Sequence, residues 1–166
     1  MAYSNFKKRT FDVLFSSLSI LFLSPVFILT AVLIKLFDSG PILFKQKRIG
    51  RNGAEFLFYK FRSMPVGTKN TPSDVINKVK ITWVGKFIRR LNIDELPQLI
   101  NILKGEMSIV GPRPSLPAQT DLNYLRKKNN SFKCIPGLTG LAQVNSFNGM
   151  TVKEKAKLDG EYYNKR

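Results

Sequence analysis

The sequence predicts an α+β protein that is mostly α-helical. Two observations predict this class: an uncharged apolar segment near the N-terminus, and a β-hairpin pattern followed by amphipathic helical patterns in the rest of the chain. Residues 1–38 are expected to form a basic flank and a re-entrant membrane helix, which enters the bilayer and returns. Residues 39–166 are expected to form one small cytoplasmic domain, because a chain of 166 residues suffices for a single core.

The apolar segment, residues 13–34, has no charged side chain. As a helix it would be about 33 Å long, enough to cross a bilayer core of about 30 Å. Pro25 lies near its middle and removes a backbone donor, and the Ser24 hydroxyl can bond the Leu21 carbonyl that is left free. We therefore expect a helix–bend–helix at Ser24 and Pro25 rather than a straight span or a buried core helix.

The charges beside this segment favour the same interpretation. Basic residues flank it on both sides: Lys7, Lys8 and Arg9 before it, and Lys35, Lys45, Lys47, Arg48 and Arg51 after it. Basic residues stay on the cytoplasmic side of a membrane. Both ends of the segment are therefore expected in the cytoplasm.

After residue 38 the pattern predicts short elements. Strands at 42–46 and 55–61 flank Asn52-Gly53, a strong hairpin signal. Ser73 is expected to cap a helix whose apolar stripe faces the core or the membrane interface. That stripe repeats every four residues: Val75, Val79, Trp83 and Phe87. Further helices are expected at 95–104, at 115–130 and at the end of the chain.

The composition restricts the chemistry. Lys and Arg number 27 against 11 acidic residues, a formal net charge of +16, which indicates an anionic partner: nucleic acid, anionic lipid or a phosphorylated substrate. The absence of histidine excludes Ser–His, Cys–His and His-ligated metal sites. The single cysteine, Cys134, excludes an internal disulfide and a Cys-rich zinc site.

The acidic pair Asp94 and Glu95 is the sharpest local feature. In the predicted helix, Asp94 would be the N-cap and Glu95 would lie in the first turn, an ordinary place for acids. Arg89 and Arg113 stand nearby in the sequence, and guanidinium groups suit bidentate phosphate binding. Carboxylates beside arginines fit Mg²⁺ with a diphosphate, and a carboxylate can attack phosphorus.

Three long stretches carry motifs in one order. They are GPILFKQKRIGRNGAEFLFYKFRSM at 40–64, LNIDELPQLINILKGEMSIVGPRP at 91–114, and PGLTGLAQVN at 136–145. Together with the basic N-terminus and the Ser-Pro bend, they resemble the bacterial sugar transferase family of monotopic phosphoglycosyl transferases. The resemblance implies transfer of a sugar-1-phosphate from a UDP-sugar to polyprenyl phosphate, undecaprenyl in most bacteria, with release of UMP. It also implies a place on the cytoplasmic face of the bacterial inner membrane, in contact with anionic lipid.

The resemblance also assigns roles to residues. Asp94 would be the nucleophile that forms a phosphosugar intermediate, and Glu95 would act as a base or position the metal. Arg89 and Arg113 occupy phosphate-binding positions, and Mg²⁺ is the expected cofactor. Among the remaining motif residues, Lys60, Arg62 and Gln143 are expected as substrate contacts. Glu106, where the family usually has aspartate, is expected as a further metal ligand or a hydrogen-bonding group.

Two departures from the family pattern bear on function. Ile135 stands where a basic residue often precedes Pro-Gly, and Ser146-Phe147 replace a frequent Gly-Arg pair. The alternative is therefore a catalytically impaired, membrane-associated scaffold of the same fold. A nucleic-acid-binding module would explain the charge but neither the apolar segment nor the acidic pair, so nucleic acid is not expected as a partner. The sugar and the oligomeric state stay open, with a homodimer among the alternatives.

Overall fold

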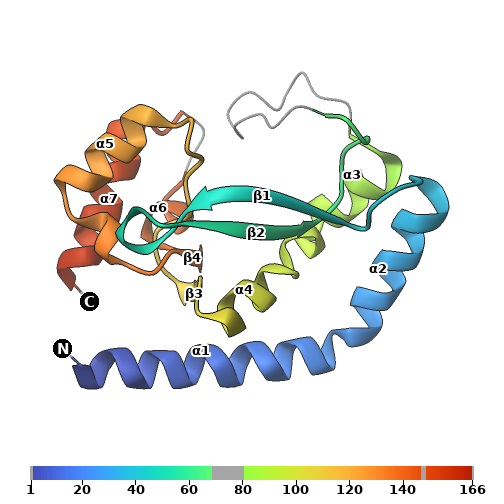
Figure 1. Ribbon diagram of the computed structural model, residues 1–166, viewed down its shortest axis with the longest axis horizontal. Coiled ribbons are helices and arrows are strands. Elements are labelled where there is room, and N and C mark those ends of the chain that lie inside the picture. Colours follow the sequence, from blue (N-terminus) through green and yellow to red (C-terminus); the bar gives the residue numbers. More distant parts are fainter. Residues whose placement is uncertain (1, 69–80, 147–148, 166) are drawn as a thin grey trace.

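The protein is described by a computed structural model that covers residues 2–68, 81–146 and 149–165 (Figure 1). It is mostly helical with two small sheets, which confirms the predicted α+β class. The described α-helices are α1 (Ala2–Phe22), α2 (Ser24–Phe37), α3 (Trp83–Arg90), α4 (Gln98–Lys104), α5 (Thr120–Lys128), α6 (Leu141–Val144) and α7 (Val152–Lys165). The strands are β1 (Leu43–Ile49), β2 (Glu55–Phe61), β3 (Ser108–Val110) and β4 (Gly137–Thr139). Short 3-10 helices are η1 (Arg51–Gly53), η3 (Ile93–Glu95) and η4 (Ser131–Lys133).

The N-terminal segment is bent as the sequence predicts. Helices α1 and α2 meet at Leu23 with an angle of 61° between them. The Ser24 hydroxyl donates to the Leu21 carbonyl at 2.8 Å, and Pro25 lies in the first turn of α2, where its missing N–H costs nothing. By length and apolar composition, no single described helix reaches what a membrane crossing needs, whereas the bent pair does so as a unit.

One side of α1 is fixed to the rest of the protein. Helix α4 lies between α1 and the β1–β2 hairpin (Figure 1). The Arg9 guanidinium donates to the carbonyls of Ile102 and Leu103 at the end of α4, where a cation is favourable. The buried Asp12 carboxylate accepts from the Ile109 amide of β3 at 2.9 Å. These polar contacts determine which side of α1 faces the domain.

The other side of the bent pair is apolar and exposed. We define the exposed apolar face as Phe11, Leu14, Phe15, Leu18, Leu21, Phe22, Ile28, Leu29, Val32, Leu36 and Phe37. Phe22 and Leu36 remain 75% and 71% exposed. Many large apolar side chains exposed on two adjoining helices mark a surface that meets a partner or a lipid.

The predicted hairpin is confirmed. Strands β1 and β2 pair antiparallel, with Gln46 opposite Phe58 and Phe44 opposite Lys60. The chain reverses through η1, where Asn52 adopts φ 58°. Asparagine tolerates this left-handed backbone better than most residues, which explains the strength of the signal in the sequence.

The second sheet was not predicted. Strands β3 and β4 pair in parallel, with Ser108 opposite Gly137, although almost thirty residues separate them. A Cβ on Gly137 would lie 2.1 Å from the amide nitrogen of Gly111, so only glycine permits this approach. Helices α5, α6 and α7 lie beside this sheet and away from α2 (Figure 1).

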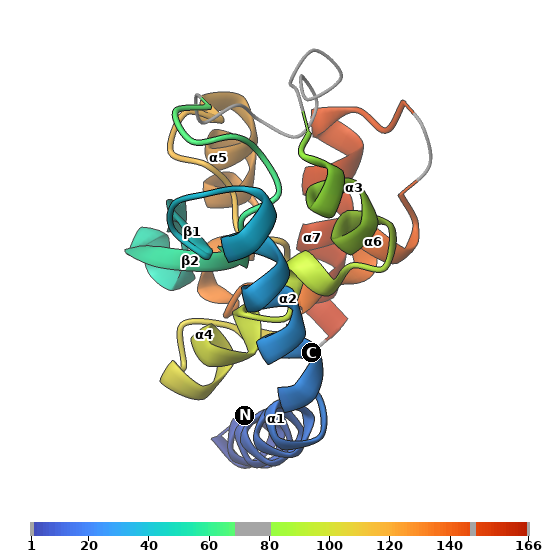
Figure 2. The same cartoon turned by 90° about the vertical axis from the view of Figure 1, so that its right-hand side faces the viewer.

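Three predicted helix boundaries are wrong. Helix α3 begins at Trp83, because Thr82 is extended and its side chain accepts from the Gly85 amide as an N-cap. Ser73, Val75 and Val79, expected earlier in the same helix, lie outside the described residues. Helix α4 begins at Gln98 rather than at residue 95, and α5 covers only 120–128 of the expected 115–130. Viewed along α1, α3 and α4 are separate short helices (Figure 2).

Gly85 explains why α3 packs so closely against the end of β2. A Cβ at this position would lie 2.1 Å from the Ser63 carbonyl oxygen. The same carbonyl accepts from the Thr82 amide at 3.2 Å, so the backbones of the two segments are in contact. The glycine that weakens the helical pattern in the sequence is therefore required by packing.

Two apolar clusters support the hairpin. One has Ile34, Phe61, Val84 and Ile88 at its centre, and the other has Phe58, Leu99, Ile102 and Met107. Phe27 of α2 packs against both clusters. Helix α2 is therefore part of the core of the domain along one side, although its other side is exposed.

Replacing Gly85 with alanine should displace α3 from Ser63 and lower the free energy of unfolding by about 1–3 kcal/mol, because the added methyl group has no space. Denaturation in detergent, with the exposed neighbour Lys86→Ala as a control, measures this. A Gly85→Ala protein as stable as the Lys86→Ala protein would contradict the packing described.

Candidate active site

The acidic pair, Asp94 and Glu95, lies in η3, between α3 and α4. Asp94 is not the N-cap of a helix, because α4 begins three residues after Glu95 and Pro97 occupies its N-cap position. Asn92 adopts φ 56° and reverses the chain after α3. The pair is therefore presented on a tight turn, and simple helix capping does not account for it.

Apolar neighbours on both sides orient this turn. Ile93 precedes the acidic pair and Leu96 follows it, and both pack against the cluster around Ile34 and Phe61. Their burial leaves the two carboxylates directed toward β2, where Lys60 is located.

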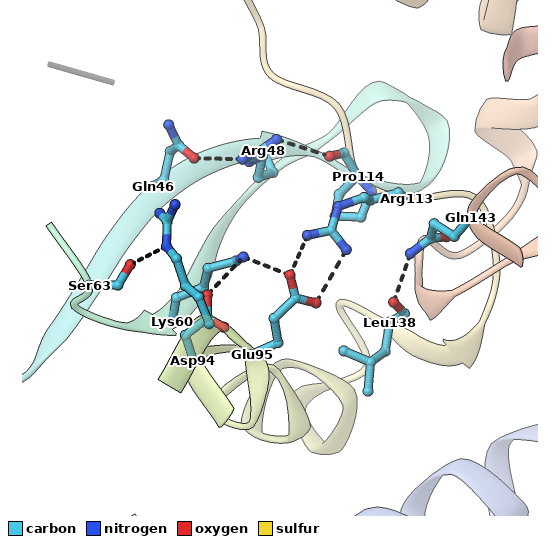
Figure 3. A network of polar contacts seen from close by, with 11 residues as sticks. Gln46, Arg48, Lys60, Ser63, Asp94, Glu95, Arg113, Pro114, Leu138 and Gln143 are labelled. Atoms are coloured by element: carbon cyan, nitrogen blue, oxygen red, sulfur yellow. Dashed lines mark hydrogen bonds and ion pairs between the residues drawn. The ribbon is translucent and has the colours of Figure 1, made fainter. Parts of the chain in front are cut away.

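Two cations from different segments hold Glu95. Lys60 Nζ of β2 lies 2.7 Å from Oε1 of Glu95. Arg113, in the turn Pro112–Pro114, donates through Nη2 to Oε1 at 2.5 Å and through Nη1 to Oε2 at 3.3 Å. This forked contact is the bidentate arrangement that arginine makes with carboxylates (Figure 3). The structure thus brings the predicted Lys60, Glu95 and Arg113 together.

Asp94 is the more buried member of the pair, with 4% of the residue exposed. Its Oδ2 lies 3.5 Å from Lys60 Nζ, a longer contact than the one that Glu95 makes. Arg89 stands on the same side, and its Nε donates to the Ser63 hydroxyl at 2.8 Å. Asp94 is therefore less tightly held by cations than Glu95 is.

This difference separates the two pKa values. Burial raises the pKa of Asp94 above its ordinary value, and the charges of Lys60 and Arg89 only partly oppose the effect. Burial would also raise the pKa of Glu95, but the hydrogen bond and charge of Arg113, together with Lys60, hold it at about 2. Asp94 is thus the more basic carboxylate, and Glu95 stays ionised.

A cavity of about 310 Å³ opens beside the acidic pair. Six cationic side chains line it, and we call it the basic cavity: Lys45, Arg48, Lys60, Arg62, Arg89 and Arg113. None of the described residues that line it is acidic. Apolar side chains, among them Phe44 and Val66, line it as well. Such a site attracts an anion strongly, because its charges lie in a partly desolvated hollow.

Arg62 lines the basic cavity and also bonds the backbone at the end of α2. Its Nη2 donates to the Asp38 carbonyl at 2.5 Å, at the end of α2, and 5% of the residue is exposed. Its Nε and Nη1 have no hydrogen-bond partner among the described residues. The contact with Asp38 joins the bent helix pair to β2.

Two predicted site residues are not brought to the acidic pair. Glu106 accepts from the side chain of Asn101 at 2.6 Å, and Asn101 in turn bonds the backbone of β2. Gln143 donates to the Leu138 carbonyl at 2.8 Å, away from the acidic pair (Figure 3). The acidic pair does not itself line the basic cavity but contacts Lys60 and Arg113, which do. In the described part of the chain Glu106 and Gln143 make local contacts instead: Glu106 orients the Asn101 amide, and Gln143 bonds a carbonyl of β4.

Sequence reasoning missed Arg48 and Gln46 as site residues, and treated Arg48 only as a flanking charge. Both line the basic cavity, and Arg48 Nη2 donates to Gln46 Oε1 at 2.7 Å. Their spacing of two residues on a strand places them on one face. This alternation along a strand of the predicted hairpin is the signal that could have identified them.

The carboxylates near the basic cavity supply only some of the ligands that a magnesium ion needs. In the described portion of the chain no three acidic, cysteine or histidine side chains gather as a metal site. Both oxygens of Glu95 already face cations, whereas the contact of Asp94 uses Oδ2 alone. Mg²⁺ is commonly held by one or two carboxylates together with substrate phosphate oxygens. Asp94 fits that pattern, whereas Glu95, expected to help place the metal, has both oxygens in contact with Lys60 and Arg113. Glu106, expected as a further ligand, does not join them in a group of three in the described portion of the chain.

The two pKa shifts predict opposite pH effects. In a ¹³C-carboxyl NMR titration, with Asp94→Asn and Glu95→Gln for assignment, Asp94 should titrate above 3.8 and Glu95 near 2. Ionised Glu95 stabilises the fold fully above pH 4.5, and this contribution is lost as the pH falls toward 2. Asp94 has the opposite effect. Because burial raises its pKa above 3.8, its ionisation as the pH rises lowers the free energy of unfolding. Glu95 titrating above Asp94 would contradict this electrostatic arrangement.

Comparisons with known proteins place the chain among sugar transferases. The galactosyl transferase CpsE of Streptococcus agalactiae serotype III is 44% identical over 142 residues, covering 76% of this chain and 31% of that protein. The exopolysaccharide production protein ExoY of Rhizobium meliloti is 35% identical over 178 residues, covering 93% and 76%. The UDP-glucose:undecaprenyl-phosphate glucose-1-phosphate transferase of Escherichia coli is 38% identical over 164 residues, covering 93% and 35%. The chain thus spans about a third of the first and last of these relatives. The model of the bacterial sugar transferase family matches residues 3–166, and the protein belongs to that family.

Proposed function

We propose that the protein is a phosphoglycosyl transferase, which moves a sugar-1-phosphate from a UDP-sugar to polyprenyl phosphate and releases UMP. The observation that carries this proposal is the acidic pair at the edge of the basic cavity, with one carboxylate more basic than the other. A relative is named for UDP-glucose and undecaprenyl phosphate, and another as a galactosyl transferase, so the sugar stays open. The name of ExoY points to exopolysaccharide assembly as the process served.

In the first step, an oxygen of Asp94 attacks the β-phosphorus of the UDP-sugar. The bond from that phosphorus to the oxygen of UMP breaks, UMP leaves, and an acyl phosphate links Asp94 to the sugar. A raised pKa supports this role, because the more basic carboxylate is the better nucleophile. Arg89 and Arg113 line the basic cavity and bind the diphosphate there.

In the second step, a phosphate oxygen of polyprenyl phosphate attacks the same phosphorus. The bond to Asp94 breaks, which regenerates the carboxylate and yields the polyprenyl diphosphate sugar. The attacking phosphate is already an anion, so the step needs no strong base. Glu95, with a pKa of about 2, is a poor base, and we assign it to holding Lys60 and Arg113 in place.

We propose Mg²⁺ as the cofactor, held by Asp94 together with substrate phosphates, while Glu95 keeps its contacts with Lys60 and Arg113. Bound there, it would neutralise the charge that develops on the leaving UMP. The cationic side chains of the basic cavity complete the neutralisation of the diphosphate.

We also propose that the bent helix pair enters one leaflet and returns, with both ends in the cytoplasm of the bacterial cell. The exposed apolar face supports insertion, since leaving so many large apolar side chains in water would be costly. Trp83 of α3 packs beside Phe37 with ring centroids 5.9 Å apart and the planes tilted by 57°. Both side chains are exposed, as aromatic residues are at a headgroup boundary. This arrangement would hold the acidic pair near the phosphate of a lipid substrate, among anionic lipids.

Purified protein in nanodiscs, with Mg²⁺, polyprenyl phosphate and a panel of UDP-sugars, should release UMP with at least one donor. Asp94→Asn should lower the rate by at least a thousandfold, because it removes the nucleophile, whereas the exposed acid Asp121→Asn should not. No release with any donor would favour the impaired scaffold, and activity surviving in Asp94→Asn would refute the proposed nucleophile.

The re-entrant arrangement predicts one-sided labelling. In a Cys134→Ser background, single cysteines at the exposed positions Lys7 and Arg51 should react with a membrane-impermeant maleimide from the cytoplasmic side only. A cysteine at Phe22, on the exposed apolar face, should be protected by lipid and react after detergent is added. Labelling of the two outer positions from opposite sides would show a crossing instead.

A further inference from the structure

Two arginines that form no hydrogen bond with Asp94 or Glu95 hold the backbone of the turn that carries Arg113. Arg126 of α5 donates through Nη1 to the Arg113 carbonyl at 2.8 Å. Arg48 of β1 donates through Nη1 to the next carbonyl, that of Pro114, at 3.2 Å. The two side chains thus make similar hydrogen bonds, but their other contacts differ.

Arg126 is fully neutralised. Its Nε and Nη2 both bond Oδ2 of Asp159 in α7, at 2.8 and 2.6 Å. The two residues are 3% and 1% exposed, and neither lines the basic cavity. A buried ion pair of this kind serves the structure, because breaking it leaves a charge without a partner.

Arg48 differs in each of these respects. The structure gives it no ion pair with a described carboxylate, and its buried Nε has no hydrogen-bond partner among the described residues. Its guanidinium lies 5.2 Å from the ring centre of Phe58 and lines the basic cavity near Arg113. Partial burial and the positive charge of Arg113 lower the pKa of Arg48 to about 10, and the negative charge of Glu95 opposes them only in part.

A guanidinium that only held the Pro114 carbonyl would gain from a carboxylate partner such as Asp159. We propose that Arg48 is a substrate-binding residue, whose charge is balanced by the diphosphate of the nucleotide sugar in the basic cavity. The inference rests on the proposed function and adds a third guanidinium, beside those of Arg89 and Arg113, to the anion site. Gln46 fixes the plane of the Arg48 group through its 2.7 Å hydrogen bond.

The experiment measures binding of UDP, which carries the diphosphate but no sugar to transfer, by calorimetry in detergent. Arg48→Met should raise the Kd for UDP about tenfold or more and make it less sensitive to NaCl, because a cation is lost. Arg48→Lys keeps the charge and should stay within about threefold of the wild type. An unchanged Kd in Arg48→Met would overturn the inference.

A double-mutant cycle separates binding from positioning. If Arg48 contacts the diphosphate, Arg48→Met should weaken UDP binding in an Arg113→Met background as well. If it only positions Arg113, the effect should vanish in that background, which would overturn the inference.

Melting temperatures without ligand separate binding from folding. Arg48→Met should melt only slightly lower than the wild type, since it loses two hydrogen bonds but breaks no ion pair, whereas Arg126→Met should melt much lower. A fall in Arg48→Met as large as that in Arg126→Met would assign Arg48 to the structure alone and overturn the inference.

UMP release, measured in the same preparations, reports on the proposed function separately. An active wild type with normal UDP binding in Arg48→Met would contradict the inference alone, and a wild type that binds UDP but releases no UMP would contradict the proposed function alone.

Discussion

The ion-pair arrangement at Glu95 is the interaction on which the site depends. One carboxylate joins Lys60 of the hairpin to Arg113 of the turn after β3, so three segments distant in the sequence meet at a single side chain. Partly buried charges are costly without partners, and each of these three partly neutralises the others. The low pKa of Glu95 follows from this arrangement. Burial raises the pKa of Asp94, and its 3.5 Å contact with Lys60 opposes this only in part, so Asp94 is the more basic carboxylate.

Apolar packing provides the second constraint, because it fixes where the acidic pair lies relative to the bent helices. Ile93 and Leu96 flank the pair and pack on the same cluster as Ile34 of α2. The buried Asp12 of α1 and the Arg62 contact at the end of α2 attach the two helices to the sheets. The position of the acidic pair relative to the bent helix pair is thus fixed by apolar packing and by these polar contacts.

Local signals in the sequence predicted local structure well. The Ser24-Pro25 bend, the hairpin at Asn52 and the amphipathic pattern of α4 each follow from a few neighbouring residues. The parallel pairing of β3 with β4 was not predictable, because its partners lie far apart and depend on the close approach of Gly137 to Gly111. The interpretation of Asp94 as a cap failed for a related reason. Packing of Ile93 and Leu96 against α2 turns the chain there, and helix propensity does not.

The same limit applies to the site. Family motifs identified Lys60, Asp94, Glu95 and Arg113, which the structure brings together, but they also included Glu106 and Gln143, which it does not. Intact-mass spectrometry, after mixing the protein with a UDP-sugar and Mg²⁺ but no polyprenyl phosphate, tests the covalent intermediate most directly. The protein should gain the mass of one sugar phosphate, located on Asp94 by peptide mapping and removed when polyprenyl phosphate is supplied. An adduct on Glu95, or none in a preparation that turns over normally, would contradict an intermediate on Asp94.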